Sequence, residues 1–373
     1  MSTPQRCAIV GTGVVAHLHA AAIADDPHAE IVAVVDAVRS TADAFAARWG
    51  SPVVYNDLDA LLQAEHPDVV IICTPPVAHR DQSLAALASG AHVIVEKPPA
   101  PSLDEFEEMI AAADRADRQL VVVFQQRSGT AAAHVADLLR SGALGRPLLA
   151  TCETLWYRDE DYFAAPWRGK WQTEGGGTTL GHGIHQIDLL AHLMGDWTSV
   201  QGRIWRLDRE TETEDASTAT ITFANGVVAQ ATTSAVSPRQ TSSIRIDTQR
   251  ATVTVDHLYT HGLENWSITP APGYEAQADE WRFPTEGERS NHAPFLREVF
   301  AALATGGALP EIAREQRRSF EIVAAIYASS AAGGAVIAPD DLATHATHRT
   351  GFASPVSDMR PFAATPDTAA APA

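Results

Sequence analysis

Short runs of continuous apolar residues alternate with longer helix-like segments through the first third of the chain. The apolar runs lack polar alternation, so both faces of each strand are expected to be covered. Strands that alternate with helices build a parallel sheet with right-handed crossovers. The expected strands are 7–10, 31–35, 68–73, 92–95 and 120–124, and the expected helices are 14–24, 41–49, 58–65, 81–89 and 102–117. The sequence therefore predicts an α/β, doubly wound domain.

The turn after the first strand has the pattern GxGxxA in residues 11–16. Gly11 permits a tight turn, Gly13 lets the backbone approach a pyrophosphate, and Ala16 keeps the helix close to the strand. The N-terminus of the next helix presents N–H groups to such a phosphate. We therefore expect a dinucleotide at this turn, bound by Gly11, Thr12, Gly13, Val14 and Val15. The alternative is a tight strand–helix turn with no ligand.

Asp36 ends the second expected strand, 20 residues after Ala16. A carboxylate at this distance accepts hydrogen bonds from a ribose diol and repels a 2′-phosphate, which favours NAD. Arg39 lies three residues further on and is placed to reach a 2′-phosphate, so NADP stays open. A merely local capping role for Asp36 is the other interpretation.

The strand 92–95 ends in Glu96-Lys97-Pro98. In an open parallel sheet, ligands bind at the carboxyl ends of the strands. A lysine there can act as a point charge or proton donor on a reacting oxygen, because its pKa shifts readily on burial. Alone, the motif is equally compatible with a salt-bridged strand end.

Charge and composition exclude several classes of function. The formal net charge is −19, which argues against binding nucleic acid or an anionic membrane through bulk charge. The three cysteines indicate no disulfide framework, and we find neither a signal-peptide pattern nor a run of about 18 apolar residues. We expect a cytoplasmic protein.

Beyond residue 125 the hydrophobic pattern changes to period two, typical of antiparallel strands with one covered face. Asn225-Gly226 between two such segments is a strong hairpin signal. We expect a Rossmann domain over 1–125, a substrate-binding and oligomerisation α+β domain with a large, mainly antiparallel sheet over 126–338, and an Ala- and Pro-rich tail over 339–373. The tail is expected to be poorly ordered or to lie as an arm on a neighbour.

The loop from Tyr157 to Gly183 carries aromatic and charged residues before three consecutive glycines, 175–177. Trp167 and Trp171 can stack on a sugar or nicotinamide face, and Arg168 can hold a carboxylate or phosphate. Equally, the tryptophans can anchor the loop to the core.

A metal site in the pattern HxxHxxDxxxH, residues 182–192, is disfavoured. His185 and His192 lie two helical turns apart, about 10 Å along the axis at about 1.5 Å per residue. That separation is too large for a single ion. We expect no metal, with Asp188 packing near His185 or capping locally.

Together these motifs resemble the Gfo/Idh/MocA oxidoreductases, relatives of glucose-fructose oxidoreductase and inositol dehydrogenase. The resemblance rests on residues 11–19, 72–100, 175–195 and 317–336. It implies Lys97 as the catalytic lysine, a cis Lys97–Pro98 bond, and His185 as the catalytic histidine. The further residues expected at the cofactor are Thr74, Pro75, His79, Glu96, Lys97, Gln126, Trp167 and Arg168, and those expected at the substrate are Lys97, Tyr157, Trp171, His182 and His185.

One position departs from the family. Many of these dehydrogenases carry an aspartate four residues before the histidine, where this chain has Gly181. Either His182 replaces the aspartate, or Lys97 and His185 work as a pair. A third interpretation is that the chain has left simple alcohol dehydrogenation.

The resemblance implies hydride transfer between NAD, or NADP, and a hydroxyl-bearing carbon of a sugar, cyclitol or glycoside. A homodimer or homotetramer formed through the second domain's sheet is expected. Two alternatives stay open: a redox-neutral glycoside cleavage or elimination with tightly bound NAD, and a non-catalytic, regulatory NAD(P)-binding protein.

Overall fold

The structure, a computed structural model, describes residues 3–50, 52–306, 309, 312–344, 349–353 and 357–358. Within them, a parallel sheet has the order β3-β2-β1-β4-β5-β6, as a doubly wound domain requires. Its strands are β1 (Gln5–Val10), β2 (Ala29–Val35), β3 (Val53–Tyr55), β4 (Val69–Ile72), β5 (His92–Val95) and β6 (Leu120–Val122). The predicted α/β class is confirmed, but the short β3 was not predicted.

Helices cover both faces of this sheet, which explains the continuous apolar character of its strands. The helices are α1 (Ala16–Ala24), α2 (Arg39–Arg48), α3 (Leu58–Glu65), α4 (Pro76–Ala88) and α5 (Leu103–Ala116). On one face α1 and α2 pack against Cys7, Ile9 and Ile71, while α3, α4 and α5 cover the other face. The helix predicted to begin at Asp81 begins earlier, because Pro76 occupies a first-turn position where its missing N–H costs nothing.

The second sheet has the order β13-β12-β11-β7-β10-β9-β8-β14. Its strands are β7 (Pro147–Tyr157), β8 (Trp197–Arg206), β9 (Ala216–Phe223), β10 (Val228–Ser234), β11 (Val236–Thr248), β12 (Ala251–His257), β13 (Trp266–Pro270) and β14 (Ser357–Asp358). It is mixed rather than purely antiparallel, since β10 pairs with β7 and β14 with β8 in parallel. The Asn225-Gly226 hairpin between β9 and β10 is confirmed, with Gly226 at φ +88°.

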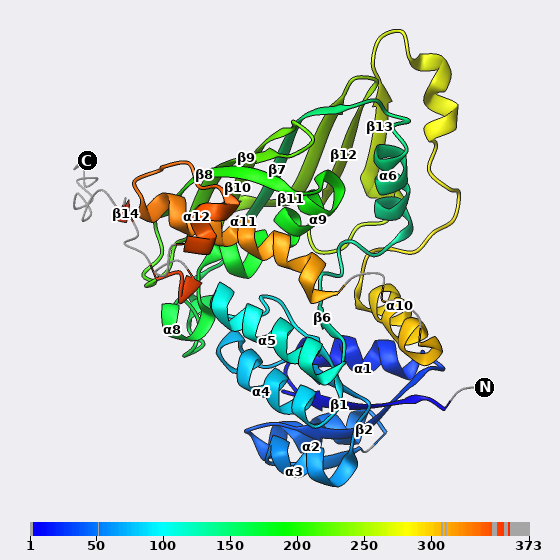
Figure 1. Cartoon of the computed structure of the whole chain (residues 1–373), viewed down its shortest axis with the longest axis vertical. Helices are drawn as coiled ribbons and strands as arrows, with labels where there is room; N and C mark the ends of the chain where they lie inside the picture. The colour runs from blue at the N-terminus through cyan, green and yellow to red at the C-terminus, as the bar shows by residue number, and fades with distance from the viewer. Residues whose placement is uncertain are drawn as a thin grey trace, which may run out of the picture.

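Helices α9 (Ile184–Met194) and α11 (Ala313–Ala331) lie between the large sheet and the first domain (Figure 1). Helix α6 (Thr130–Arg140) packs on α9. Helix α10 (His292–Thr305), predicted within the second domain, instead packs on α1 and buries Phe295, Leu296 and Phe300 in the first domain's core. The chain therefore crosses between the two domains more than once.

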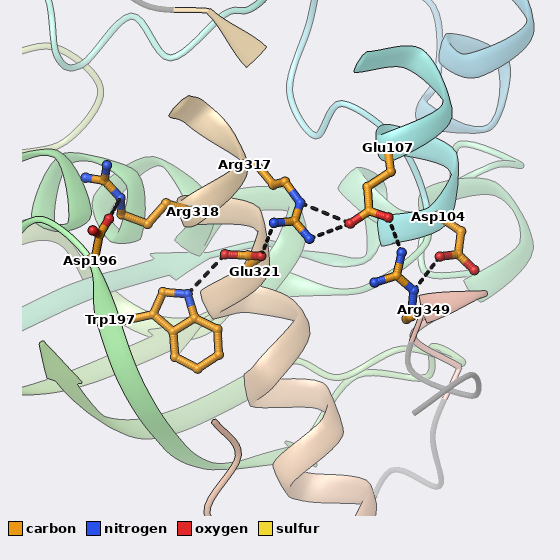
Figure 2. A network of polar contacts seen from close by, with 8 residues as sticks. All are labelled: Asp104, Glu107, Asp196, Trp197, Arg317, Arg318, Glu321 and Arg349. Carbon is orange, nitrogen blue, oxygen red and sulfur yellow. Dashed lines mark hydrogen bonds and ion pairs between the residues drawn. The ribbon is translucent and has the colours of Figure 1, made fainter. Parts of the chain in front are cut away.

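Polar contacts join α11 to α5 at the domain boundary (Figure 2). Arg317 pairs with Glu107 of α5 and, at 2.6 Å, with Glu321 of its own helix. Arg349 pairs with Glu107 and, at 2.7 Å, with Asp104. The tail over 339–373 was predicted to be poorly ordered or to lie on a neighbour, but Leu342 of α12 (Pro339–Thr344) and Phe352 are buried in this chain's own core, and residues 357–358 form β14. Residues 345–348, 354–356 and 359–373 lie outside the described residues.

Candidate active site

The glycine turn has the shape that a dinucleotide requires. Gly11 has φ +83°, and a Cβ there would lie 2.9 Å from Thr74 Cγ2, so only glycine fits. A Cβ on Gly13 would meet no described atom within 4 Å, which leaves the turn open on the side that a pyrophosphate would occupy. Val14 is 90% exposed on the same turn. The residues present therefore fit a nicotinamide dinucleotide.

The Asp36 carboxylate is hydrogen-bonded to this turn. Its Oδ2 accepts hydrogen bonds from Thr12 N at 2.7 Å and Thr12 Oγ1 at 2.8 Å, and its Oδ1 accepts from Val38 N. A carboxylate has about four acceptor positions, so a ribose diol can still bind. Arg39, on α2, pairs with Asp43 at 2.8 Å. Asp36 therefore accepts the local hydrogen bonds that its capping interpretation requires. Its contact with a ribose stays a prediction, and so does the choice between NAD and NADP.

The loop after β4 is tied to the loop after β5. The His79 ring lies between the carbonyl oxygens of Thr74, 2.7 Å from Nε2, and Pro98, 2.9 Å from Nδ1. Burial lowers the pKa of His79, so the neutral ring donates to one carbonyl at a time. The Lys97–Pro98 bond is cis, as predicted. Thr74, Pro75, His79 and Lys97 are thus brought together at one edge of the sheet.

Glu96, the residue before Lys97, is hydrogen-bonded by two histidines. The Nε2 atoms of His19 and His292 lie 2.8 and 3.0 Å from the same oxygen, Oε1. Burial opposes ionisation of Glu96, but these hydrogen bonds outweigh it and hold its pKa well below the ordinary value. The three side chains are close enough to hold a metal ion, yet both rings already contact one oxygen, so hydrogen bonds account for the arrangement. Neither histidine was predicted to act here.

Lys97, which follows β5, reaches the turn that leads into α9, the helix that carries His185. Lys97 Nζ donates to Gly181 O at 3.1 Å, and burial lowers the pKa of its amine. Burial and the charge of Lys97 hold the pKa of His185 well below 6.5. The His185 ring makes no hydrogen bond within the described residues, and its Nδ1 is buried. A neutral imidazole with an unused acceptor is what a general base requires.

The chain segment that precedes His185 is packed closely against other parts of the backbone and core. A Cβ on Gly176 would overlap Tyr327 Oη, and one on Gly177 would overlap the Glu214 carbonyl oxygen. The buried Glu214 carboxylate accepts from Gly177 N and Thr179 N, both at 2.9 Å, and from Tyr327 Oη at 2.7 Å. A π-helical turn, η1 (Thr179–Gly183), follows and leads into α9. Such turns occur often at functional sites.

His182 lies in an aromatic and cationic cluster that sequence reasoning found only in part. Its Nε2 is 3.0 Å from Tyr162 Oη, and its ring centroid is 5.0 Å from that of Trp156. Arg168 also bonds to Tyr162 Oη and pairs with Glu174 at 3.3 Å. Burial raises the pKa of Glu174 to about 6. The signal that could have found Tyr162 was weak: one aromatic residue in an acidic run.

Tyr157 and Trp156 point to opposite faces of β7. Alternation along β7 puts Trp156 toward His182 and Tyr157, 42% exposed, on the other face, where the Arg209 guanidinium lies 5.0 Å from its ring centroid. Arg158 shares the Trp156 face. The contact of Tyr157 with substrate stays a prediction, although Arg158, and not Tyr157, lies on the Trp156 side of the strand.

Three other predicted residues have structural partners. Trp171, in the short helix α8 (Trp171–Glu174), packs edge-on against Tyr327, which is its anchoring role. Gln126 is buried and bonds to Gln186 of α9 and to Tyr259 O. Trp167 stacks under Arg168, whose Cζ is 4.1 Å from its ring centroid. Ligand contacts for these three stay predictions.

Asp188 does not act as expected from its spacing. It is fully buried and pairs with Arg127, with Arg127 Nε 2.6 Å from Oδ2. Because Arg127 follows β6 and Asp188 lies on α9, this ion pair ties the segment that leaves the first domain to α9 rather than simply capping α9. Among the described residues, no helix is long and apolar enough to span a bilayer.

Comparison with known proteins agrees with this arrangement. Residues 5–124 match the model of an oxidoreductase family with an NAD-binding Rossmann fold, and residues 132–254 match the GFO/IDH/MocA C-terminal domain. D-glucoside 3-dehydrogenase of Escherichia coli is 31% identical over 284 residues, covering 69% of this chain and 80% of the relative. D-apiose dehydrogenase of Paraburkholderia graminis is 28% identical over 348 residues, covering 88% of each chain.

Solved structures share the whole architecture. The WlbA dehydrogenase of Bordetella pertussis, in complex with NADH and UDP-GlcNAcA, superposes with a TM-score of 0.81 at 26% identity. The superposition covers 90% of this chain and 99% of that one. The two-domain fold is thus shared.

Proposed function

The chain belongs to the Gfo/Idh/MocA family of NAD(P)-dependent oxidoreductases, and from this premise we propose that it is a sugar or cyclitol dehydrogenase in which Lys97 and His185 act as an acid/base pair. The observation that carries the proposal is that Lys97 bonds to the carbonyl oxygen of Gly181, four residues before His185, whose buried Nδ1 has no hydrogen-bond partner among the described residues. Relatives named for a D-glucoside, D-apiose and scyllo-inositol support the substrate class.

The residues of this chain divide the chemistry between them. When bound, a nicotinamide would accept a hydride from the substrate carbon, or return it in the reverse direction. Lys97 would donate a hydrogen bond to the substrate oxygen and stabilise negative charge developing on it. Neutral His185 would accept the hydroxyl proton at its unpaired ring nitrogen. Glu96, fixed as a carboxylate by two histidines, would orient the nicotinamide side of the cofactor.

A panel of free sugars, inositols and alkyl glycosides, each incubated with NAD⁺ or NADP⁺, tests the activity. We expect stoichiometric formation of reduced cofactor with at least one member and a preference for NAD⁺. Cofactor that co-purifies and cycles with no net reduction would support the redox-neutral alternative. Cofactor binding without turnover of any member would support the regulatory one.

The assembly is also a proposal. We propose that a homodimer or homotetramer forms through the large sheet, whose face away from α9 and α11 carries polar side chains such as Thr220, Gln230 and Arg245. A cytoplasmic location stays a prediction. Light scattering of the purified protein measures the oligomeric state directly.

A further inference from the structure

Positive charge gathers beside His182 in a chain whose net charge is −19. We propose that Arg158 binds an oxyanion carried by the substrate, so that the enzyme prefers an acidic sugar, a uronate or a sugar phosphate, to its neutral counterpart. This inference rests on the proposed function and adds the charge of its substrate.

Arg158 is positioned by its neighbours rather than extended into solvent. Its Cζ lies 4.6 Å from the ring centroid of Trp156 and 5.2 Å from that of Tyr162. Both rings also contact the His182 ring, with centroid separations of 5.0 and 5.7 Å. The guanidinium is therefore held against the two aromatic residues that enclose His182, which directly follows the Gly181 carbonyl bonded to Lys97.

The charge of Arg158 is not balanced by the protein. Its Nη1 donates to Tyr157 O at 3.0 Å and to Gln240 Oε1 at 3.3 Å, and its Nη2 donates to Tyr259 Oη at 3.3 Å. All three acceptors are neutral, and no described carboxylate forms an ion pair with it. The adjacent acid, Asp159, instead caps α7 (Glu160–Phe163) by accepting from Tyr162 N at 3.0 Å.

One donor of Arg158 is left without an acceptor. Its Nε is buried and has no hydrogen-bond partner among the described residues. A buried, unpaired donor is costly, and donors on a charged group cost more than neutral ones. Arginine forms bidentate hydrogen bonds to carboxylate and phosphate, so an oxyanion that displaced the 3.3 Å contacts of Nη1 and Nη2 would balance the charge of Arg158.

Neighbouring charges do not cancel this excess. Arg168, on the other side of Tyr162, has a partner in Glu174, 3.3 Å away. Glu96 is occupied by two histidines. Lys97 and Arg158 thus remain as cations that no described acid pairs with directly. Burial and the charges of Arg158, Lys97 and Arg168 lower the pKa of His182, which is consistent with a positive environment.

Matched substrates test the inference. Methyl β-D-glucoside is compared with methyl β-D-glucuronide, which tests a carboxylate as the oxyanion. Glucose is compared with glucose 6-phosphate, which tests a phosphate. Turnover with NAD⁺ gives kcat/KM, and calorimetric titration of the NADH-loaded protein gives Kd without requiring turnover. We expect an acidic member to have at least a tenfold higher kcat/KM and tighter Kd than its neutral partner.

The variants are Arg158→Gln, Arg158→Lys and, as a control, Arg282→Gln. Arg282 is exposed, pairs with Asp279 at 2.6 Å and follows η3 (Glu275–Trp281), which packs on the edge strand β13, three strands away from β7. Arg158→Gln is expected to lower the acidic-to-neutral ratio at least tenfold, mainly through KM. Arg158→Lys should keep part of the preference, and Arg282→Gln should keep all of it.

Two results would overturn the inference: equal or better binding of the neutral sugars, or an unchanged acidic-to-neutral ratio in a folded Arg158→Gln protein. If no sugar is oxidised at all, the proposed function fails, and the calorimetric comparison still decides whether Arg158 selects an acidic sugar. If Arg158→Gln does not fold, the same comparison with wild type at low and high salt replaces it, because an ion pair weakens as screening increases. Affinity for the acidic sugars that is indifferent to salt would then count against the role of Arg158.

Discussion

Gly181 is the residue whose carbonyl oxygen contacts Lys97. A Cβ there would meet no described atom within 4 Å, so the chain has room for a side chain at this position. The Lys97 ammonium group donates to the Gly181 carbonyl oxygen. A carbonyl dipole stabilises an ammonium group less than a carboxylate does, and burial already lowers the pKa of Lys97.

This arrangement predicts the effect of placing an acid at residue 181. Gly181→Asp should raise the pKa of Lys97, since a nearby opposite charge favours the charged form. If Lys97 acts as an ammonium group, kcat/KM falls at high pH as Lys97 deprotonates. The alkaline limb of the kcat/KM profile should therefore move to higher pH in the variant. The pH profile of the active substrate measures this shift.

Gly181→Asn is the matched control, since it adds almost the same volume without charge. Its alkaline limb should stay at the wild-type position. A limb that moves equally in both variants would show that bulk at residue 181, and not charge beside Lys97, sets the profile.

Among the elements, the glycine run and the π-helical turn η1 determine where the site residues lie. Glu214, between β8 and β9, and Tyr327, on α11, hold residues 176–179 from two directions. Three consecutive glycines are compatible with either a flexible or a tightly folded segment, and the close contacts of Gly176 and Gly177 show that this one is tightly folded. The partners could not be predicted, because 113 residues separate the two side chains that meet here.

The cost of crowding this run can be measured. Gly177→Ala should destabilise the protein by roughly 1–3 kcal/mol, the usual cost of forcing a methyl group into a packed site. Gly181→Ala, four residues away with no described atom near its Cβ, should keep the wild-type melting temperature or raise it slightly. Thermal unfolding of both variants is the test, and equal losses would contradict the packing argument.

Regular elements with strong apolar character were the most predictable. The limits of β5 and α3 were predicted to the residue. The strands β3, β8 and β13 were missed because they are short or half-exposed and carry little apolar signal. Tyr157 was expected at the substrate, whereas alternation along β7 puts it on the opposite side from Trp156; its contact with substrate stays a prediction.

Across the whole molecule, the two domains are joined by segments that bond to each other. Thr130 N donates to Glu288 O at 3.1 Å, and Ser290 N donates to His261 O at 2.8 Å. The His261 ring accepts from Trp266 Nε1 at 3.0 Å and donates to Gln126 O at 3.1 Å, which sets its neutral tautomer. Burial lowers the pKa of His261 to about 3.

This histidine gives stability a defined pH dependence. Its pKa is lower in the folded chain than the 6.5 of the unfolded chain, so its contribution is complete above pH 6.5 and is lost as pH falls. Between pH 7.5 and pH 5 the loss is at most about 2 kcal/mol, from about 1.4 kcal/mol per pH unit. Chemical denaturation at both pH values should therefore show that the free energy of unfolding decreases less between pH 7.5 and pH 5 in His261→Gln than in wild type.

His66→Asn is the control for that measurement. His66 is exposed and has φ +45°, a conformation that asparagine tolerates. The decrease in the free energy of unfolding of His66→Asn between the two pH values should equal that of wild type. If His261→Gln shows the same drop as both, the buried neutral ring is not what couples pH to stability.

Single-turnover reduction of NAD⁺ by the best substrate, in wild type, Lys97→Met and His185→Ala, tests the central claim most directly. Each protein is first saturated with cofactor and substrate, so that the observed rate reports the hydride-transfer step. We predict that each substitution slows this step at least 100-fold, as expected for loss of acid–base catalysis or of charge stabilisation, while NAD⁺ affinity stays within a few-fold. Rates within a few-fold of wild type in both variants would contradict the assignment of Lys97 and His185.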